Sequence, residues 1–329
     1  MADKKLKQES VNKPIKTKID FVLLSLCTCK RPLMLKEALL SINNLKFPEN
    51  VRVEVLVIDN DEEESAKSCV DEVSKNLKCK IHYLVEKQRG IAFARNKMLD
   101  GAMALGATHI LCFDDDEILD ENCLIEHINF YNSEEKVYIS SGPAYNKFIG
   151  NFPKYITDSI IFKQSTSKET GLVRRKCATN NVFFPVSLVS DYGLKFSVEY
   201  VFMGGEDGDF FEKATDLGFT IVWKKEAVVY ELVTSSRANL DYILAKSYYN
   251  GYSVSLLKLK NPKKKRKRIL YILKFFILCI LNGLILIPSI FLGVYMFFKT
   301  LEVIVKTKGK FDGMIKNKPI DFYKNIYGE

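Results

Sequence analysis

Four acidic residues in a row are the first candidates for chemistry. Asp114, Asp115, Asp116 and Glu117 directly follow an apolar stretch at residues 108–113. Adjacent carboxylates repel one another, and a hard cation such as Mg²⁺ or Mn²⁺ relieves this repulsion because it prefers oxygen ligands. Such a cation, bound by one or two carboxylates, often completes its shell with substrate phosphates. Taken alone, the cluster fits equally well as a solvated turn or a helix N-terminus.

A second acidic pair, Glu206-Asp207, follows two glycines and opens a predicted amphipathic helix that ends near Gly218. A carboxylate at such a position can act as general base towards a hydroxyl group. The simpler alternative is a helix cap, in which Asp207 accepts hydrogen bonds from backbone N–H groups. The pair on its own favours the cap.

Several further polar residues can bind a phosphorylated ligand. Arg89-Gly90 and, one helical turn later, Arg95 can face a diphosphate, although ordinary surface ion pairs are the alternative. Asp59 can accept hydrogen bonds from a base or ribose, or simply form a turn. Glu231 and Arg237 can hold a diphosphate or an acceptor, or can pair only with each other.

The pattern of apolar residues predicts the elements that carry these groups. Apolar runs typical of buried strands cover residues 21–27, 51–58, 80–85 and 108–113, and helical patterns cover residues 32–44, 64–76 and 91–105. Strands and helices that alternate at this spacing predict a mainly parallel sheet covered on both faces. Ligands bind such sheets beyond the carboxyl ends of the strands. We therefore expect the segments 28–31, 59–61 and 114–117 to lie along one edge.

The rest of the body shows a more mixed pattern. Short strands are predicted at residues 219–223 and 227–230, and a helix is predicted at residues 240–257.

The composition changes sharply near the C-terminus. Residues 263–268 are six consecutive basic residues, and residues 269–298 contain one charge, Lys274. An apolar stretch this long is a candidate membrane span, or a re-entrant hairpin broken at Asn282-Gly283 and Pro288, and the alternative is a buried helix of a soluble fold. The chain from Lys258 onward carries a net charge of +12, so the total of +9 leaves −3 for the first 257 residues. The basic excess therefore belongs to the tail and does not indicate a nucleic-acid groove in the body.

Other classes of site find little support. The eight cysteines are scattered, which favours buried free thiols over a zinc site. The P-loop, the dinucleotide-binding glycine pattern and the nucleophile elbow are all missing from the sequence. The N-terminus has no apolar signal core, so we expect the body to stay in the cytoplasm.

The motifs, taken in order, resemble the family 2 inverting glycosyltransferases, which have the GT-A fold. The resemblance covers roughly residues 20–255 and rests on Thr28-Cys29-Lys30-Arg31-Pro32, Val57-Ile58-Asp59-Asn60, Gly90 to Asn96, Ile110 to Asp116, Gly205-Glu206-Asp207-Gly208-Asp209, and Val229-Tyr230-Glu231 with Arg237. It implies an α/β fold with a Rossmann-like nucleotide-binding half and an acceptor half.

The resemblance also implies roles for individual residues. Asp207 would be the catalytic base, and Asp114 and Asp116 would bind Mg²⁺ or Mn²⁺. The nucleotide-sugar site would comprise Thr28, Arg31, Asp59, Arg89, Gly90, Arg95, Asp115, Glu206 and Arg237. Cys29-Lys30 departs from the Tyr-Asn or Phe-Asn of many relatives, and Glu231 replaces a metal-contacting His.

These features predict a domain plan. It consists of a disordered lead-in (1–19), a GT-A domain (20–257, with halves at 20–117 and 118–257), a basic linker (258–268), an apolar membrane segment (269–298) and a basic tail (299–329).

The expected function is transfer of a sugar from a nucleotide-sugar, UDP-linked by family default, to a hydroxyl of a lipid-linked or glycolipid acceptor. We expect the protein to act in cell-surface polysaccharide or lipopolysaccharide synthesis, at the cell membrane with the catalytic domain on the cytoplasmic side. The alternatives are a polyprenyl-phosphate sugar transferase and a catalytically inactive membrane scaffold.

Overall fold

The computed structural model describes residues 14–136, 138–163, 169–200, 204–260 and 286–316, with residues 277, 280, 281, 284 and 320. Most of the expected lead-in and of the basic linker lies outside these residues, as do residues 269–276 and five later positions of the apolar segment 269–298. Within the described part of the chain, no helix is both long and apolar enough to span a membrane.

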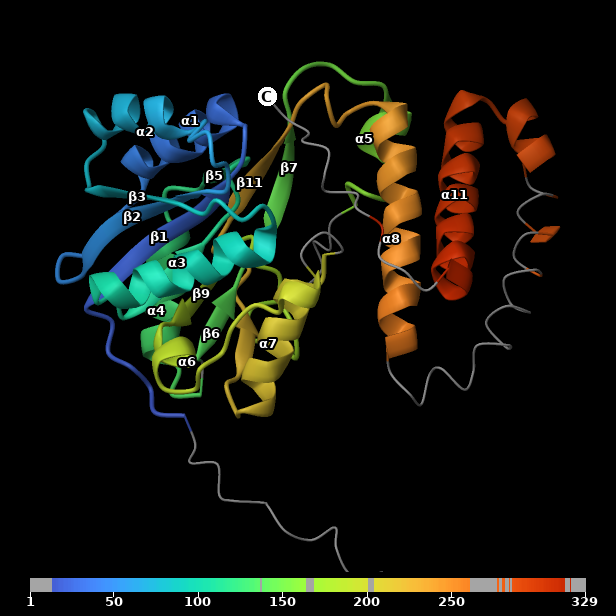
Figure 1. The fold of residues 1–329 in the computed structure, drawn as a ribbon. Helices are drawn as coiled ribbons and strands as arrows, with labels where there is room; N and C mark the ends of the chain where they lie inside the picture. Colours follow the sequence, from blue (N-terminus) through green and yellow to red (C-terminus); the bar gives the residue numbers. More distant parts are fainter. Residues whose placement is uncertain are drawn as a thin grey trace, which may run out of the picture. The chain divides into compact units, whose positions relative to one another are not determined.

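Strands and helices alternate along most of the chain (Figure 1). The first half contains β1 (Phe21–Thr28), α1 (Pro32–Ser41), β2 (Arg52–Asp59), α2 (Lys67–Ser74), β3 (Ile81–Val85), α3 (Ile91–Leu105), β4 (His109–Cys112), β5 (Glu117–Leu119), α4 (Cys123–Ser133), β6 (Ile139–Ser141), β7 (Ala144–Phe148) and α5 (Lys154–Thr157). The second half contains β8 (Val173–Arg174), β9 (Val182–Pro185), α6 (Ser187–Ser190), α7 (Glu206–Asp216), β10 (Ile221–Trp223), β11 (Val229–Val233), α8 (Leu240–Lys260) and α11 (Val294–Lys316).

The main sheet has the strand order β3-β2-β1-β4-β9-β6-β10-β8, and β5-β11-β7 form a second sheet. The neighbours β3, β2, β1 and β4 run parallel, which confirms the predicted mainly parallel sheet. β9 pairs antiparallel with both β4 and β6. The register places Thr28 beside Asp59, and Asp59 beside Val85, so the carboxyl ends of the three strands coincide.

Helices cover both faces of this sheet because side chains alternate along each strand. On one face, Val22, Leu24 and Leu26 pack with apolar residues of α1, α2 and α4. On the other face, Leu23 and its neighbours pack with α3, α6 and α7. Figure 1 shows α1 and α2 on one side of β1 and α3 on the other. The helices packed on both faces of the sheet therefore hold the ends of its strands in fixed positions.

The chain divides into two compact units. The first contains most residues up to Tyr230 apart from Tyr145–Ser165, and includes the main sheet. The second contains Tyr145–Ser165 and the chain from Glu231 onward. The boundary passes through β7 and β11.

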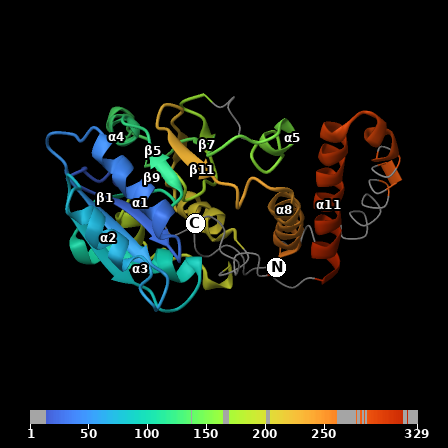
Figure 2. The same ribbon diagram turned by 90° about the horizontal axis from the view of Figure 1, so that it is seen from above.

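Two long helices, α8 and α11, lie side by side in the second unit (Figures 1 and 2). Their contact has no room for side chains at three glycines. A Cβ atom added to Gly251 would lie 2.1 Å from the Lys306 carbonyl oxygen, and one added to Gly309 would lie 2.0 Å from that of Tyr248. Gly313 is equally confined against Tyr252. The sequence analysis did not predict that part of the basic tail forms this helix.

A buried carboxylate ties α11 to its surroundings within the second unit. Glu302 is 2% exposed. It accepts hydrogen bonds from the hydroxyl groups of Ser159, at 2.7 Å, and Ser247, at 3.0 Å. The backbone N–H of Ile160 donates to its other oxygen. Because a buried carboxylate without such donors is costly, these contacts fix where α11 can pack.

Two buried histidines in the first unit should make stability depend on pH. Burial lowers the pKa of His109 to about 3 and the pKa of His127 to about 4. An imidazole in the unfolded chain titrates near 6.5, so the unfolded state takes up these protons first as the pH falls. The free energy of unfolding should therefore decrease below pH 6.5, by up to ~1.4 kcal/mol per pH unit for each histidine.

Replacing His109 with Phe should weaken this dependence. The His109 ring stacks on Phe183 with centroids 5.0 Å apart, and its Nε2 has no hydrogen-bond partner among the described residues. A phenyl ring keeps the stacking on Phe183 and gives up one hydrogen bond, between His109 Nδ1 and the Thr108 hydroxyl at 3.1 Å. Urea unfolding at several pH values between 6.5 and 4 should give a shallower slope for H109F than for the natural protein. Equal slopes would show that His109 does not titrate as its burial requires.

Candidate active site

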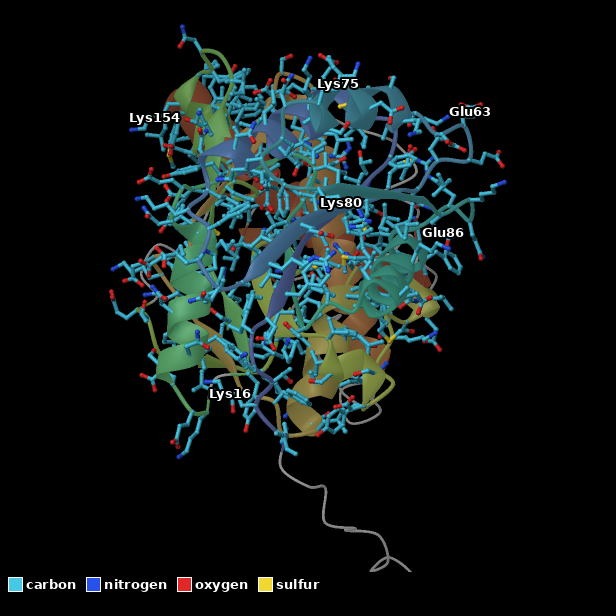
Figure 3. The ribbon with its side chains drawn as sticks, turned by 90° about the vertical axis from the view of Figure 1, so that its left-hand side faces the viewer. Lys16, Glu63, Lys75, Lys80, Glu86 and Lys154 are labelled. Carbon is cyan, nitrogen blue, oxygen red and sulfur yellow. The ribbon has the colours of Figure 1, made fainter. Side chains whose placement is uncertain are left out.

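Polar residues gather where β1, β2 and β4 end, as expected for a parallel sheet. Figure 3 marks this edge by Glu63 and Glu86, which follow β2 and β3 and lie towards the same side, whereas Lys80 precedes β3. The first unit therefore brings segments 28–31, 59–61 and 114–117 to one edge, and this prediction is confirmed.

Asp115 and Asp116 are held by groups from the end of β1. Asp115 is 2% exposed, and its two oxygens contact the Thr28 hydroxyl at 2.7 Å and the Arg31 guanidinium at 3.1 Å. The same Arg31 nitrogen lies 3.0 Å from Asp116. A protein cation therefore already offsets part of the repulsion that the sequence analysis assigned to a metal ion alone. Thr28, Arg31, Asp115 and Asp116 form one connected cluster.

Asp114 differs from its two neighbours because its side chain is partly exposed. Its backbone N–H donates to the Glu117 carboxylate at 2.7 Å, which fixes the turn after β4. Among the described residues, no group of three or more His, Cys, Asp or Glu side chains is arranged to hold a metal ion. The residues do fit a cation bound by one or two carboxylates, whose remaining ligands are phosphate oxygens.

Asp59 lies inside the fold. Its side chain is 0% exposed, and one carboxylate oxygen accepts hydrogen bonds from the Ala66 N–H and the Tyr83 hydroxyl, both at 2.8 Å. Burial raises its pKa, although these hydrogen bonds oppose the shift. These contacts fix the Asp59 side chain in the fold, and its contact with the nucleoside stays a prediction.

Asn60 organises the loop that precedes α3. Its amide nitrogen donates to the carbonyl oxygens of Glu86 and Gln88, both at 2.8 Å, and its oxygen accepts from the Gly90 N–H at 2.7 Å. Gly90 has φ of 138°, a conformation that favours glycine. Arg89, beside it, is exposed at this edge. Asn60 thus sets the position of Arg89 and Gly90.

The sequence gives no individual role to Asn60 or its neighbour Asp61. Asp61 is 5% exposed, and its carboxylate lies 3.6 Å from the Lys30 ammonium group. The signals in the sequence are that both residues follow a strand predicted to end at this edge and that Asn60 belongs to a motif of the family resemblance.

Arg95 and Glu206 form a buried ion pair that joins the start of α3 to the start of α7. Burial pulls the pKa of Arg95 down, but the carboxylates of Glu206, Asp207 and Asp114 outweigh it and leave that pKa above its ordinary value. Burial raises the pKa of Glu206, against the effect of Arg95. Arg95 and Glu206 contact each other, and the contact with a nucleotide-sugar that the family resemblance implies for both stays a prediction.

Asp207 follows Glu206 in the first turn of α7. Gly205, with φ of 102°, allows the chain to turn into this helix. One Asp207 oxygen accepts a hydrogen bond from the Gly208 N–H at 2.6 Å, and the side chain is partly exposed. The carboxylates of Asp207 and Asp114 both help to raise the pKa of Arg95, so both lie within electrostatic reach of its guanidinium. This arrangement suits a base that faces the acidic cluster.

Glu231 and Arg237 belong to the second unit. The Arg237 guanidinium lies 3.0 Å from the Glu231 carboxylate. The sequence analysis left open whether these residues hold a ligand or pair with each other, and the structure shows the pair.

Comparisons with known proteins agree with this arrangement. Residues 25–193, about half of the chain, match glycosyl transferase family 2. The succinoglycan biosynthesis protein ExoM of Rhizobium meliloti (strain 1021) is 27% identical over 228 residues, which cover 69% of this chain and 72% of that protein.

Solved structures share the fold. The mannosyltransferase PcManGT of Pyrobaculum calidifontis, in complex with GDP-Man and Mn²⁺, aligns with a TM-score of 0.60 at 14% identity, over 94% of this chain and 92% of that one. TarS 1-349 of S. aureus, in complex with UDP-GlcNAc, aligns with a TM-score of 0.51 at 15% identity, over 89% of this chain and 91% of that one. The alignment spans 55% of a longer TarS chain.

The family match covers β1 to α6, and the fold and the carboxylate cluster agree with it. The chain therefore belongs to glycosyl transferase family 2 and is an inverting glycosyltransferase.

Proposed function

We propose that this enzyme transfers a sugar from a nucleotide-sugar to a hydroxyl group of a lipid-linked or glycolipid acceptor during cell-surface polysaccharide synthesis. The observation that carries the proposal is the cluster of Asp114, Asp115 and Asp116 at the sheet edge. Asp207, like Asp114, lies within electrostatic reach of the buried Arg95. A relative named for succinoglycan biosynthesis supports the polysaccharide, and a structural neighbour that binds UDP-GlcNAc supports a UDP-linked donor.

The chemistry follows from where the carboxylates lie. In a single displacement, the acceptor hydroxyl attacks the anomeric carbon and a nucleoside diphosphate leaves from the opposite face. Asp207 would accept the hydroxyl proton as general base. Arg31 would hold Asp115 and Asp116 in place, so that the carboxylates keep their positions when the diphosphate arrives.

A divalent cation, Mg²⁺ or Mn²⁺, is part of the proposal. Asp114 and Asp116 would hold it, and when bound it would offset the negative charge of the leaving diphosphate. The Mn²⁺ in the PcManGT complex supports a divalent ion in a protein of this fold.

Contact with a membrane is also proposed, and exposed apolar side chains support it. Ile280, Leu284, Ile287 and Phe291 are each between 65% and 86% exposed, and further exposed apolar residues, among them Ile277, Ile290 and Leu292, lie between and beside them. Contact with lipid would remove this stripe of apolar surface from water. The basic run 263–268 precedes this stripe in the sequence and would be attracted to the anionic lipids of the cytoplasmic leaflet. We therefore propose that the enzyme acts at the cytoplasmic face.

A screen of nucleotide-sugars tests the proposal. The full-length protein is incubated with each donor and Mn²⁺, with and without a membrane lipid extract, and nucleoside diphosphate release is measured. We expect one donor to support release that increases at least about tenfold when lipid acceptor is added. Equal transfer to soluble sugars without lipid would refute the lipid acceptor, and no release from any donor would refute the catalytic proposal.

A further inference from the structure

The buried pair of Arg95 and Glu206 stands directly beside the proposed catalytic base. Glu206 is 4% exposed and Arg95 is 9% exposed. Only one oxygen of Glu206 contacts Arg95, and the other oxygen has no hydrogen-bond partner among the described residues. Two charges removed from water in this way are costly for stability compared with apolar residues of similar size. A role beyond stability would explain why the charges are there.

The pair connects two elements that carry the site. Arg95 lies in the first turns of α3, and Glu206 is the first residue of α7. Nearby, Asn96 accepts a hydrogen bond from the Phe196 N–H and donates one to the Phe196 carbonyl, which holds the chain before α7 against α3. Asp207 is the next residue after Glu206, so fixing Glu206 fixes the backbone of Asp207.

The pair also determines which carboxylate forms an ion pair with the Arg95 guanidinium. Arg95 carries one positive charge and lies within electrostatic reach of Glu206, Asp207 and Asp114, but its direct contact is with Glu206. If Glu206 lost its charge, Asp207 would be the next acidic group on the same helix turn. A carboxylate that pairs with a guanidinium becomes a weaker base.

We propose that Arg95 and Glu206 form the positioning device of Asp207: they hold its carboxylate in place and keep the cation from pairing with it. This inference rests on the proposed function, because it takes Asp207 as the general base. Arg95 and Glu206 are then positioning residues that touch neither donor nor acceptor.

The charged groups near Asp207 determine how a variant should change the pH dependence of activity. Groups near it include Arg95 of α3, Glu206 of its own helix and the buried Cys177 thiol, which precedes β9. Lys176, whose side chain passes Gly208, pairs with Glu212. Burial raises the pKa of Cys177 well above its usual range, so this thiol stays neutral. Arg95 and Glu206 are therefore the charges whose removal should change the proton affinity of Asp207.

Opposite pH shifts in the two single variants test the inference. The acid limb of the pH profile of kcat/KM is measured for the full-length natural protein, E206Q and R95M. In E206Q the Arg95 guanidinium can pair with Asp207, so the acid limb of the kcat/KM profile should move to lower pH by about one unit. In R95M the negative charge of Glu206 is no longer neutralised and lies beside Asp207, so the acid limb should move to higher pH by a similar amount. In both variants kcat should fall at least about tenfold while the donor KM stays within about twofold.

Controls separate misfolding from loss of positioning. Circular dichroism and the melting temperature show whether each variant is folded, and R95K retains the cation if R95M does not fold. R95K should keep the acid limb of the natural protein at a reduced kcat. Folded variants with unchanged acid limbs would overturn the inference. Full activity of D207N would instead overturn the proposed function.

Discussion

Replacing Asp207 with Asn should lower kcat by about 10²- to 10⁴-fold, the range that a general base usually contributes. The amide keeps the size of the carboxylate but cannot take a proton from the acceptor hydroxyl. Donor binding should stay within about twofold, because the diphosphate is expected at the acidic cluster after β4. Steady-state release of nucleoside diphosphate gives kcat, and calorimetry gives the donor affinity.

A matched control lies in the same helix. Asp209 pairs with Lys213 at 2.7 Å, one turn along α7. D209N makes the same chemical change two residues away and should leave kcat within about twofold. If D207N lost donor binding together with activity, Asp207 would have a structural role. If D207N kept its activity, an acceptor that needs no base, such as polyprenyl phosphate, would be favoured.

Replacing Asp114 with Asn should have the second largest effect on activity. Asp114 is the partly exposed member of the acidic cluster and a proposed ligand of the divalent cation. Charge stabilisation by a bound cation is worth several kcal/mol, which corresponds to at least about 10²-fold in rate. We expect D114N to lose that much kcat/KM and to need a higher Mn²⁺ concentration for half-maximal turnover.

Asp115 provides the comparison for D114N. Both oxygens of Asp115 contact groups of the protein, Thr28 and Arg31, so D115N should mainly lower the melting temperature. Its half-maximal Mn²⁺ concentration should change less than that of D114N. The same Mn²⁺ dependence in D114N and the natural protein would argue against Asp114 as a ligand.

Much of the fold could be predicted because the first strands are apolar and regularly spaced. Residues buried on both faces give continuous apolar runs, and the predicted runs 21–27 and 51–58 differ from β1 and β2 by one residue at their ends. The antiparallel insertion of β9 between β4 and β6 was not predicted. β6 and β9 have three and four residues, too few for a clear pattern.

The C-terminal helix was hidden for a different reason. Gly309 and Gly313 lie in a Lys-rich stretch that looks like a solvated tail, and glycines lower helix propensity. In the folded protein these two glycines let α11 approach the backbone of α8 closely, and the sequence alone does not show this contact. A pattern read along one segment does not show the helix that packs against it.

In the site, the sequence indicated which residues gather but not which of them bind one another. The strand ends followed from the parallel sheet, so the clustering of Thr28, Asp59 and Asp115 could be predicted. The pair between Arg95 and Glu206 joins residues 111 positions apart, and no spacing rule links them. Likewise, no pattern in the sequence links Arg31 to Asp115 and Asp116, and its contact with the nucleoside stays a prediction.

The most direct test of the account is whether turnover depends on a divalent cation. The natural protein is freed of metal with a chelator and given its best nucleotide-sugar and lipid acceptor, and nucleoside diphosphate release is followed as Mn²⁺ is added back. We predict that release falls at least about 10²-fold with chelator present and returns with Mn²⁺. Full turnover in the presence of chelator would contradict the proposed roles of Asp114 and Asp116.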